Sequence, residues 1–174
     1  MTTYTTYTNA EKIAFRKALP KKYWSAGALI PDTQGQYLLV HDHQGRWNVV
    51  GGLGDAGETL LETLYREMQE EIGLQLPVQQ LLVLDDKQLM IDDYCDESWH
   101  TLWLTAPITE EQKASIRIDH QEILDYGFFP WEKCLARVPD SLARRLTHLT
   151  PSAWGFVYLE NEELPTHPTA CSAG

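Results

Sequence analysis

The amino-acid sequence predicts a single domain of the α/β class. The chain has 174 residues, which suits one ordinary domain, and 43% of them are hydrophobic, which is enough to form a core. Short apolar runs bounded by turn residues alternate with segments of helical periodicity. Because no internal repeat and no linker divides the sequence, we expect one folded unit that contains both strands and helices.

The two ends of the chain differ from its middle. Residues 1–8 are polar and repetitive, and a short helix is expected over 10–18, with Asn9 as its N-cap and Pro20 ending it. The basic residues here form either a solvated helix face or a basic rim near an anionic ligand. From Pro165 on there is no apolar periodicity. We therefore expect a lead-in and short helix over 1–22, the folded domain over 23–160 and a flexible tail over 161–174.

Between the ends, the pattern predicts strands, then one long helix, then strands again. The first two strands are expected to pair as a hairpin, because Pro31–Gly35 is rich in turn residues. Gly73 stands where a helix usually ends. In chain order the expected elements are strands at 24–30, 36–41 and 47–50, a helix at 59–72, strands at 78–84, 87–91 and 98–105 with an acidic turn at 92–97, a short helix at 108–115, a strand at 122–129, and helices at 130–137 and 139–149.

Charge and cysteine content exclude several classes of protein. The 25 acidic residues outnumber the 14 basic ones, and a net charge of −11 argues against sequence-independent binding to nucleic acid or to an anionic membrane. The three cysteines are far apart and lack metal-ligand spacing, so neither a disulfide framework nor a structural zinc site is expected. No stretch is apolar enough for a membrane span or a secretory signal, and we expect a cytoplasmic protein.

The most informative segment is the long helix. At about 100° per residue, its periodic apolar residues face the core, and Glu67, Glu70 and Glu71 share a neighbouring face. Like charges four residues apart cost a few tenths of a kcal/mol, and the helix C-terminus also disfavours anions. A hard divalent cation such as Mg²⁺ reverses both effects, because it prefers carboxylate oxygens. The alternative is a solvated acidic face.

The spacing of nine residues favours the metal site over the solvated face. They follow the order Gly, five residues, Glu, seven residues, Arg-Glu-apolar, one residue, Glu-Glu, one residue, Gly-apolar, at Gly52, Glu58, Arg66, Glu67, Met68, Glu70, Glu71, Gly73 and Leu74. This is the Nudix box, so the chain resembles the Nudix hydrolase superfamily (MutT-like), with a compatible strand order over 23–149. Val50 stands where many members have proline and Asp55 where relatives often have glutamate; we count neither against activity.

The resemblance implies the fold and the reaction. The fold is an α/β/α sandwich with a mixed β-sheet, in which the box forms a loop–helix–loop motif. The implied reaction is the Mg²⁺- or Mn²⁺-dependent hydrolysis of a diphosphate linkage in a small nucleoside diphosphate joined to a group X. Examples are a nucleotide sugar, an ADP-ribose-like compound and a nucleoside triphosphate.

The resemblance also implies the metal ligands. By position, Glu67 and Glu71 are the principal ligands, and Glu70 and the Gly52 carbonyl assist them. From the sequence alone, Arg66 can pair with Glu62 one turn before it and Glu70 one turn after it, which makes it an orienting partner. The resemblance gives Glu58 and Arg66 the role of holding the loop and the carboxylates in place.

The catalytic base and the substrate contacts are less well defined. In the superfamily the base is a helix glutamate, here Glu70, or an acidic residue on a later loop, for which Glu122 is the candidate. An ordinary strand-edge role for Glu122 is the alternative, and His120 is a weaker candidate. Arg46 and Trp47 precede the glycine loop and are candidates for contacting a phosphate or a base. Core packing is the alternative for Trp47.

Two other functions remain open. One is an isomerase that uses the Nudix fold, and the other is a nucleotide-binding sensor module without turnover. The intact set of glutamates argues against the sensor module, which has no need to retain them. For partners, we expect a small nucleotide-derived substrate, no long nucleic acid and no membrane, and a homodimer is left open.

Overall fold

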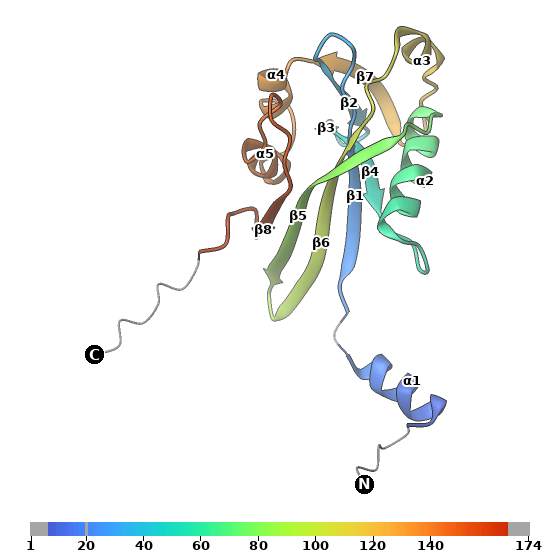
Figure 1. Ribbon diagram of the computed structural model, residues 1–174, viewed down its shortest axis with the longest axis vertical. Helices are drawn as coiled ribbons and strands as arrows, with labels where there is room; N and C mark the ends of the chain where they lie inside the picture. Colours follow the sequence, from blue (N-terminus) through green and yellow to red (C-terminus); the bar gives the residue numbers. More distant parts are fainter. Residues whose placement is uncertain (1–6, 20, 167–174) are drawn as a thin grey trace, which may run out of the picture.

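The computed structural model describes residues 7–19 and 21–166. Residues 1–6 of the expected lead-in and residues 167–174 of the expected tail, including Cys171, lie outside the described residues. Figure 1 labels the elements. The helices are α1 (Asn9–Ala18), α2 (Leu60–Ile72), α3 (Glu110–Ser115), α4 (Trp131–Leu135) and α5 (Asp140–Thr147). The strands are β1 (Tyr23–Leu29), β2 (Tyr37–Asp42), β3 (Trp47–Asn48), β4 (Val50–Leu53), β5 (Val78–Ile91), β6 (Tyr94–Thr105), β7 (Ile123–Phe129) and β8 (Val157–Glu160).

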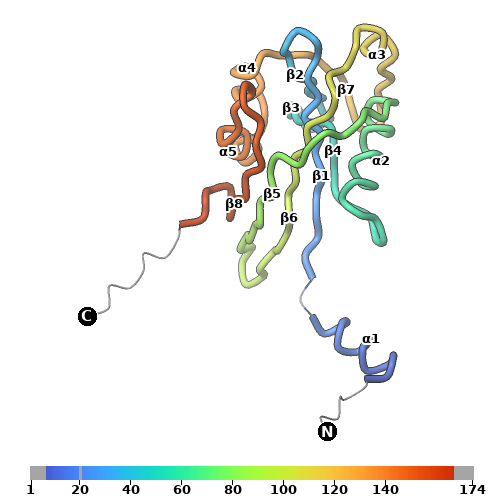
Figure 2. Tube along the Cα trace, in the orientation of Figure 1, coloured from blue at the N-terminus to red at the C-terminus, as the bar shows by residue number. Residues whose placement is uncertain are grey.

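Two β-sheets form the centre of the domain. The larger has the order β4-β1-β6-β5-β8, with β1 parallel to β6 and β5 parallel to β8, and the smaller has the order β3-β2-β7. The helix α2 lies on one side of the sheets, and α4 and α5 lie on the other (Figures 1 and 2). The predicted α/β/α arrangement with a mixed sheet is therefore confirmed. The helix α1 lies apart from both layers (Figure 1).

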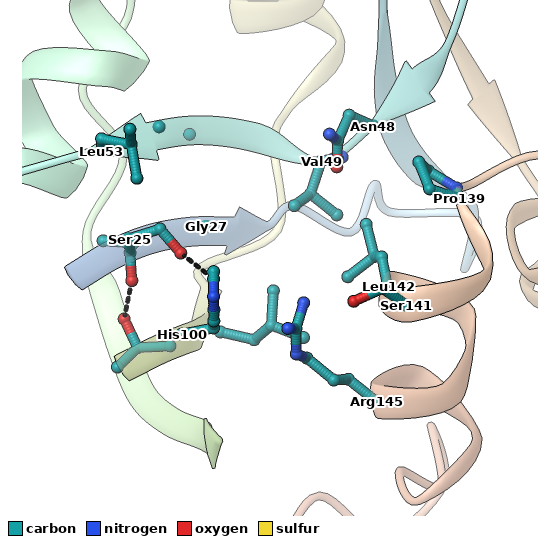
Figure 3. A pocket seen from close by; sticks show the side chains of 15 residues that line it. Ser25, Gly27, Asn48, Val49, Leu53, His100, Pro139, Ser141, Leu142 and Arg145 are labelled. Carbon is teal, nitrogen blue, oxygen red and sulfur yellow. Dashed lines mark hydrogen bonds between the residues drawn. The ribbon is translucent and has the colours of Figure 1, made fainter. Parts of the chain in front are cut away.

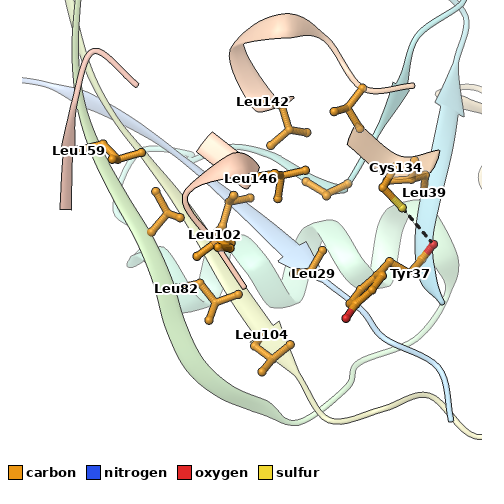
Figure 4. Close-up of a cluster of buried hydrophobic side chains, with 14 residues drawn as sticks. Leu29, Tyr37, Leu39, Leu82, Leu102, Leu104, Cys134, Leu142, Leu146 and Leu159 are labelled. Carbon is orange, nitrogen blue, oxygen red and sulfur yellow. Dashed lines mark hydrogen bonds between the residues drawn. The ribbon is translucent and has the colours of Figure 1, made fainter. Parts of the chain in front are cut away.

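Side chains on the two faces of the larger sheet form two hydrophobic clusters. In β1, Ala26 and Ala28 face α2, whereas Leu29 belongs to the cluster beneath α4 and α5 (Figure 4). That second cluster includes Leu142 and Leu146 of α5, which pack against leucines of β5 and β6. Burying each large apolar side chain stabilises the fold by about 1.5–3 kcal/mol. The clusters therefore fix α2 and α5 on opposite faces of one sheet.

Capping interactions define both ends of α2. Thr59 caps the helix, its side chain accepting the Glu62 N–H while Glu62 accepts the Thr59 N–H. Gly73 ends the helix with a left-handed φ of 69°. At α1 the expected cap is wrong by one residue: Thr8 forms a capping box with Glu11, so Asn9 is already helical. The box requires a glutamate or glutamine three residues after the cap. Glu11 stands three residues after Thr8, whereas Lys12 stands three residues after Asn9.

The expected hairpin of the first two strands forms only around its turn, where the Asp32 N–H donates to the Gln36 carbonyl and the Leu38 N–H donates to the Ile30 carbonyl. One bridge joins Pro31 to Tyr37, and β2 then pairs with β3 and β7 in the smaller sheet. The reason is that β1 has neighbours on both edges, β4 and β6, so it has no free edge for β2. Local turn chemistry predicted the reversal of the chain but not the partner of the strand.

The two strands expected at 78–84 and 87–91 are one strand, β5. Asp85, which lies in the gap between the two expected strands, is completely buried, and it accepts hydrogen bonds from Arg145 and from the backbone N–H of Glu162. Because the carboxylate is satisfied, the strand continues through it. The expected acidic turn is also shorter: only Asp92 and Asp93 lie between the strands, and β6 begins at Tyr94.

Beyond the rest of the sheet, residues 88–97 form a two-stranded projection, named the β5–β6 arm below. The pairing of β6 with β1 begins only at Ser98, and that of β5 with β8 ends at Asp86. Four large apolar side chains of the arm are exposed: Leu89, Met90, Ile91 and Tyr94. The arm therefore has two open edges among the described residues.

The strand β8 had no counterpart in the expected elements, and the packed structure continues past residue 160. Glu162 is buried and contacts Lys87, Ser141 and Arg144. Within the described part of the chain, Cys95 and Cys134 are free thiols. In the same part, no helix is long and apolar enough to cross a membrane.

Candidate active site

The strand β4 brings a pair of glycines against α2. Gly51 has a φ of 145°, and a Cβ atom there would lie 2.1 Å from the carbonyl oxygen of Ala26 in β1. Only glycine fits this position. The Gly51 N–H points to α2 and donates a hydrogen bond to Oε2 of Glu71 over 2.8 Å. A Cβ atom on Gly52 would lie 2.4 Å from Oε1 of Glu67, so its backbone also lies directly against a carboxylate.

One arginine organises most of the acidic groups around the helix. Arg66 donates from Nε to Glu58 over 2.8 Å, and from Nη1 to Glu67 over 2.8 Å and to Glu70 over 2.9 Å. Its Nη2 reaches the carbonyl of Leu53 in the glycine strand, 2.9 Å away. A planar guanidinium can hold several acceptors in fixed directions. Arg66 thereby connects the loop before the helix with the carboxylates on it.

The predicted pair between Arg66 and Glu62 is wrong. Glu62 accepts the Thr59 N–H as part of the helix cap instead. The partner of Arg66 on that side is Glu58, which also accepts the N–H of Asp55 over 2.9 Å. Glu58 lies before the helix, where helical spacing does not indicate it as a neighbour. The Arg66 and Asp55 hydrogen bonds lower the pKa of Glu58 to about 2.

Glu67 and Glu71, the two central glutamates of the helix, have too little positive charge around them to balance their own. Burial raises the pKa of Glu71 to about 8, and Glu67, Glu122 and Glu70 add to that rise, against the Gly51 N–H. Burial also raises the pKa of Glu67, and Glu70 and Glu122 reinforce the shift that Arg66 opposes. The site therefore concentrates more carboxylates than the one arginine can neutralise.

The late-loop residue Glu122 belongs to the same electrostatic environment. It is exposed in the turn immediately before β7, and its charge acts on both Glu67 and Glu71. Glu122 thus acts on the helix carboxylates although it lies 51 positions after Glu71 in the sequence. His120 differs, because it has no such effect on Glu67 or Glu71, and only its backbone carbonyl has a defined partner, Nε2 of His43 at 3.1 Å.

Among residues 7–19 and 21–166, no three His, Cys, Asp or Glu side chains are arranged ready to hold a metal ion. Arg66 occupies oxygens of Glu67 and Glu70, while the Glu71 carboxylate is turned to Gly51. The chemistry of the donors nevertheless fits Mg²⁺ or Mn²⁺, because it consists of carboxylate and carbonyl oxygens with unbalanced negative charge.

The two residues expected to contact substrate have other partners. Arg46 pairs with Asp42 in the turn between β2 and β3, with Nη2 2.8 Å from Oδ2. Trp47 is half-buried, stacks on His41 at 4.8 Å between ring centroids and packs edge-on against Phe129. Neither residue lines the pocket beside the glycines.

A pocket of 280 Å³ adjoins the opposite side of the glycine pair. Figure 3 shows it between strands of the larger sheet and α5. Its walls are mostly apolar, and its polar side chains are Ser25, Asn48, His100, Thr101, Ser141 and Arg145. Sequence reasoning missed these residues because they come from separate strands and from α5, without any local motif. Only β-strand alternation, which puts His100 and Leu102 on one face, hints at them.

His100 is a neutral group in this pocket. Its Nδ1 lies 2.7 Å from Oγ of Ser25, and its Nε2 lies 3.0 Å from Oγ of Ser98. Burial lowers its pKa to about 4, and the charges of Arg145 and Lys87 lower it further, against Asp85 and Glu162. The imidazole therefore offers a polar surface without a positive charge at neutral pH.

Comparison with known proteins agrees with this geometry. The family model described as NUDIX domain matches residues 21–150. A curated RNA pyrophosphohydrolase from Psychrobacter sp. (strain PRwf-1) is 31% identical over 125 residues, which cover 60% of this chain and 70% of the relative. The chain therefore belongs to the Nudix family, and the prediction of a Nudix-type diphosphohydrolase, a pyrophosphatase, is confirmed.

Solved structures share the fold at low sequence identity. The MutT protein from Methanosarcina mazei Go1 has a TM-score of 0.61 and 20% identity, with 75% of this chain and 95% of that chain covered. The NUDIX domain of Shewanella oneidensis NrtR, solved with ADP ribose, has a TM-score of 0.57 and 21% identity, with 75% and 88% covered. A C. elegans Ap4A hydrolase in a binary complex has a TM-score of 0.52 and 16% identity, with 72% and 93% covered.

Proposed function

We propose that the protein hydrolyses the diphosphate linkage of a small nucleoside diphosphate joined to a group X, and that it requires Mg²⁺ or Mn²⁺. The single observation that carries this proposal is the position of the Gly51–Gly52 pair. Its backbone meets the Glu67 and Glu71 carboxylates on one side and borders the 280 Å³ pocket on the other. The glycine pair thus brings a pocket next to the carboxylates, as expected of a protein that binds a nucleoside in the one and its phosphates at the other.

Glu67, Glu71 and Glu70 would hold the metal, together with the carbonyl of Gly52. A divalent ion bound there supplies charge neutralisation of the diphosphate and a bound water of lowered pKa. The Gly51 N–H fixes the carboxylate of Glu71, and Arg66 fixes those of Glu67 and Glu70. Glu58 acts indirectly, because it anchors Arg66 by two hydrogen bonds.

A carboxylate must accept a proton from the attacking water. Glu122 is supported for this role by its exposure and by its effect on Glu67 and Glu71. Glu70 is the alternative, but it is bound to Arg66. We expect Glu122→Gln to lower kcat by about 100-fold or more at saturating metal, because general-base catalysis contributes 10²–10⁴-fold. If Glu70→Gln has the larger effect and Glu122→Gln leaves kcat unchanged, the base lies on the helix.

The size of the pocket and the charge of the protein favour a small substrate. A volume of 280 Å³ lies just below the usual range for ligand pockets, about 300–1,000 Å³, and suits one nucleoside. The net charge of −11 opposes a polyanion. Because the curated relative from Psychrobacter is an RNA pyrophosphohydrolase, RNA with a 5′-triphosphate is the competing substrate.

The test is a substrate panel with Mg²⁺ or Mn²⁺. It contains nucleotide sugars, ADP-ribose, dinucleoside polyphosphates, nucleoside triphosphates and a short 5′-triphosphate RNA. We expect at least one small compound to be hydrolysed with a higher kcat/KM than the RNA. The opposite order would replace the small substrate with RNA, and hydrolysis of none, without metal binding by calorimetry, would refute the proposal.

The metal ligands are tested by Glu71→Gln, which keeps the shape of the side chain and removes its charge. We expect turnover to fall by more than about 100-fold, since losing even a residue that orients a ligand costs about 10–100-fold. The matched control is Glu111→Gln, on the exposed side of α3, for which we expect an unchanged rate. A near-normal rate for Glu71→Gln at saturating metal would refute the assignment.

A further inference from the structure

The polar groups of the 280 Å³ pocket divide into those already bonded within the protein and those available to a ligand. Both ring nitrogens of His100 are bonded to serine hydroxyls. The hydroxyl of Thr101 donates to the carbonyl of Ser25, and that of Ser141 donates to Glu162. These side chains shape the wall of the pocket, and each of their polar groups already has a hydrogen-bond partner within the protein.

Two side chains retain free N–H donors in the pocket. Arg145 uses Nε for Asp85, 2.6 Å away, and its Nη2 is 3.7 Å from Glu162, too far for a hydrogen bond. Among the described residues, neither Nη atom has a hydrogen-bond partner, although the residue is only 7% exposed. Figure 3 shows the Arg145 side chain reaching from α5 toward His100.

The second free donor is the amide of Asn48. Its Oδ1 accepts the N–H of Val49 over 3.0 Å, which leaves the Nδ2 group without a protein partner among the described residues. The ionic charge of Arg145 is balanced by Asp85. The pocket therefore presents donors without a strong net charge, which favours a neutral group rich in acceptors over another phosphate.

We propose that Arg145 and Asn48 bind the substrate's base through its acceptor edge, so that the pocket selects guanine or another keto base over adenine. The proposal rests on the proposed function and names its substrate class. Arginine pairs with O6 and N7 of guanine in the geometry best known from nucleic-acid recognition. Adenine would instead place its N6 amino donors against protein donors, and unpaired buried donors are costly.

The apolar walls of the pocket support a flat ring between the donors. Val49 and Leu53 lie on the side of the glycine strand, and Leu102 and Leu142 come from β6 and α5. The pocket and the carboxylates share Gly51 and Gly52. A base held here therefore lies beside the same two glycines that contact the carboxylates, and in a nucleotide only the sugar separates the base from the phosphates.

The experiment measures the binding of GMP and AMP by calorimetry without added metal. We expect the intact protein to bind GMP at least about tenfold more tightly, within the discrimination usual for a good bidentate pair. The same preference should appear in kcat/KM for guanine and adenine forms of whichever compound class is hydrolysed.

The variants are Arg145→Lys and Asn48→Ala. Lysine keeps a positive charge beside Asp85 but lacks the guanidinium fork, so we expect the GMP preference to fall to about threefold or less. Asn48→Ala removes the second donor without touching a buried charge, so it carries the test even where Arg145→Lys lowers the melting temperature. The control is Arg144→Lys, which also contacts Glu162 but lies outside the pocket and should keep the preference.

Equal binding of GMP and AMP by the intact protein, or an unchanged preference in both pocket variants, would overturn the inference. Hydrolysis of panel compounds without base preference would leave the proposed function standing and remove the inference alone. Selective binding of GMP by a protein that hydrolyses nothing would remove the proposed function and retain the pocket assignment.

Discussion

Arg66 holds three carboxylates and a backbone carbonyl with one guanidinium. We therefore expect the shape of this side chain, as well as its charge, to matter for catalysis. Arg66→Lys keeps the charge but loses the planar fork. We expect kcat to fall about 10–100-fold, the usual cost of losing an orienting partner of a metal ligand. The measurement is kcat as a function of metal concentration, with melting temperature recorded in parallel.

A suitable control is Arg16→Lys, on the exposed helix α1, for which we expect wild-type rates. If Arg66→Lys retains full kcat with the same metal dependence, the carboxylates do not need the fork, and the positioning role is contradicted.

Residues of the site were predictable to the extent that one helix contains them. Glu67, Glu70 and Glu71 follow from spacing along α2, because helical geometry is local. Ser25, His100 and Arg145 come from β1, β6 and α5, and only the tertiary fold brings them to one pocket. No periodicity in the sequence indicates that residues of these three elements line one pocket.

The two glycines of the strand β4 are expected to differ in their effect on stability and on metal binding. Gly51→Ala would place a Cβ atom 2.1 Å from a backbone carbonyl at a φ of 145°. Since β1 cannot move aside, we expect a loss of about 2–5 kcal/mol in the free energy of unfolding. Gly52→Ala meets the end of the Glu67 side chain instead. That side chain can rotate, so we expect weaker metal binding with a smaller loss of stability.

Urea unfolding and metal titration by calorimetry measure the two effects separately. Gly35→Ala is the control for positive φ alone, because its φ is 79° and the space around it is open; we expect a cost of about 1 kcal/mol. Equal destabilisation by all three substitutions would contradict the distinction between backbone and side-chain contacts.

Elements were predictable where their signals are local. The range of α2 follows from its periodicity and from Gly73. The partner of β2 did not follow, because strand pairing depends on which edges are free in the whole sheet. β8 was missed because, of its four residues, only Leu159 is buried, so the alternating pattern is too short to recognise.

At the scale of the whole molecule, Glu162 joins the segment after β8 to α5 and β5. Burial alone would raise its pKa, but hydrogen bonds from Lys87, Ser141 and Arg144 lower the pKa to about 2. Since the folded pKa lies below the ordinary 4.5, the unfolded state binds more protons between these values. The stabilisation is therefore complete above pH 4.5 and is lost as the pH falls toward 2.

We expect the urea midpoint of the wild-type protein to fall through this window. Glu162→Gln should lower the midpoint at pH 7 and flatten its dependence on pH. The control is Glu163→Gln, the neighbouring exposed residue. A variant at 162 with the same pH profile as the wild type would show that Glu162 does not anchor the segment.

The β5–β6 arm has a consequence for the behaviour of the protein in concentrated solution. Open strand edges are templates for pairing with another chain, and the apolar side chains of the arm make such pairing favourable. Four carboxylates surround them, those of Asp92, Asp93, Asp96 and Glu97. Two arms that approach each other therefore repel. The acidic excess of the sequence thus opposes aggregation through the arms, and this protection weakens as salt screens the charges.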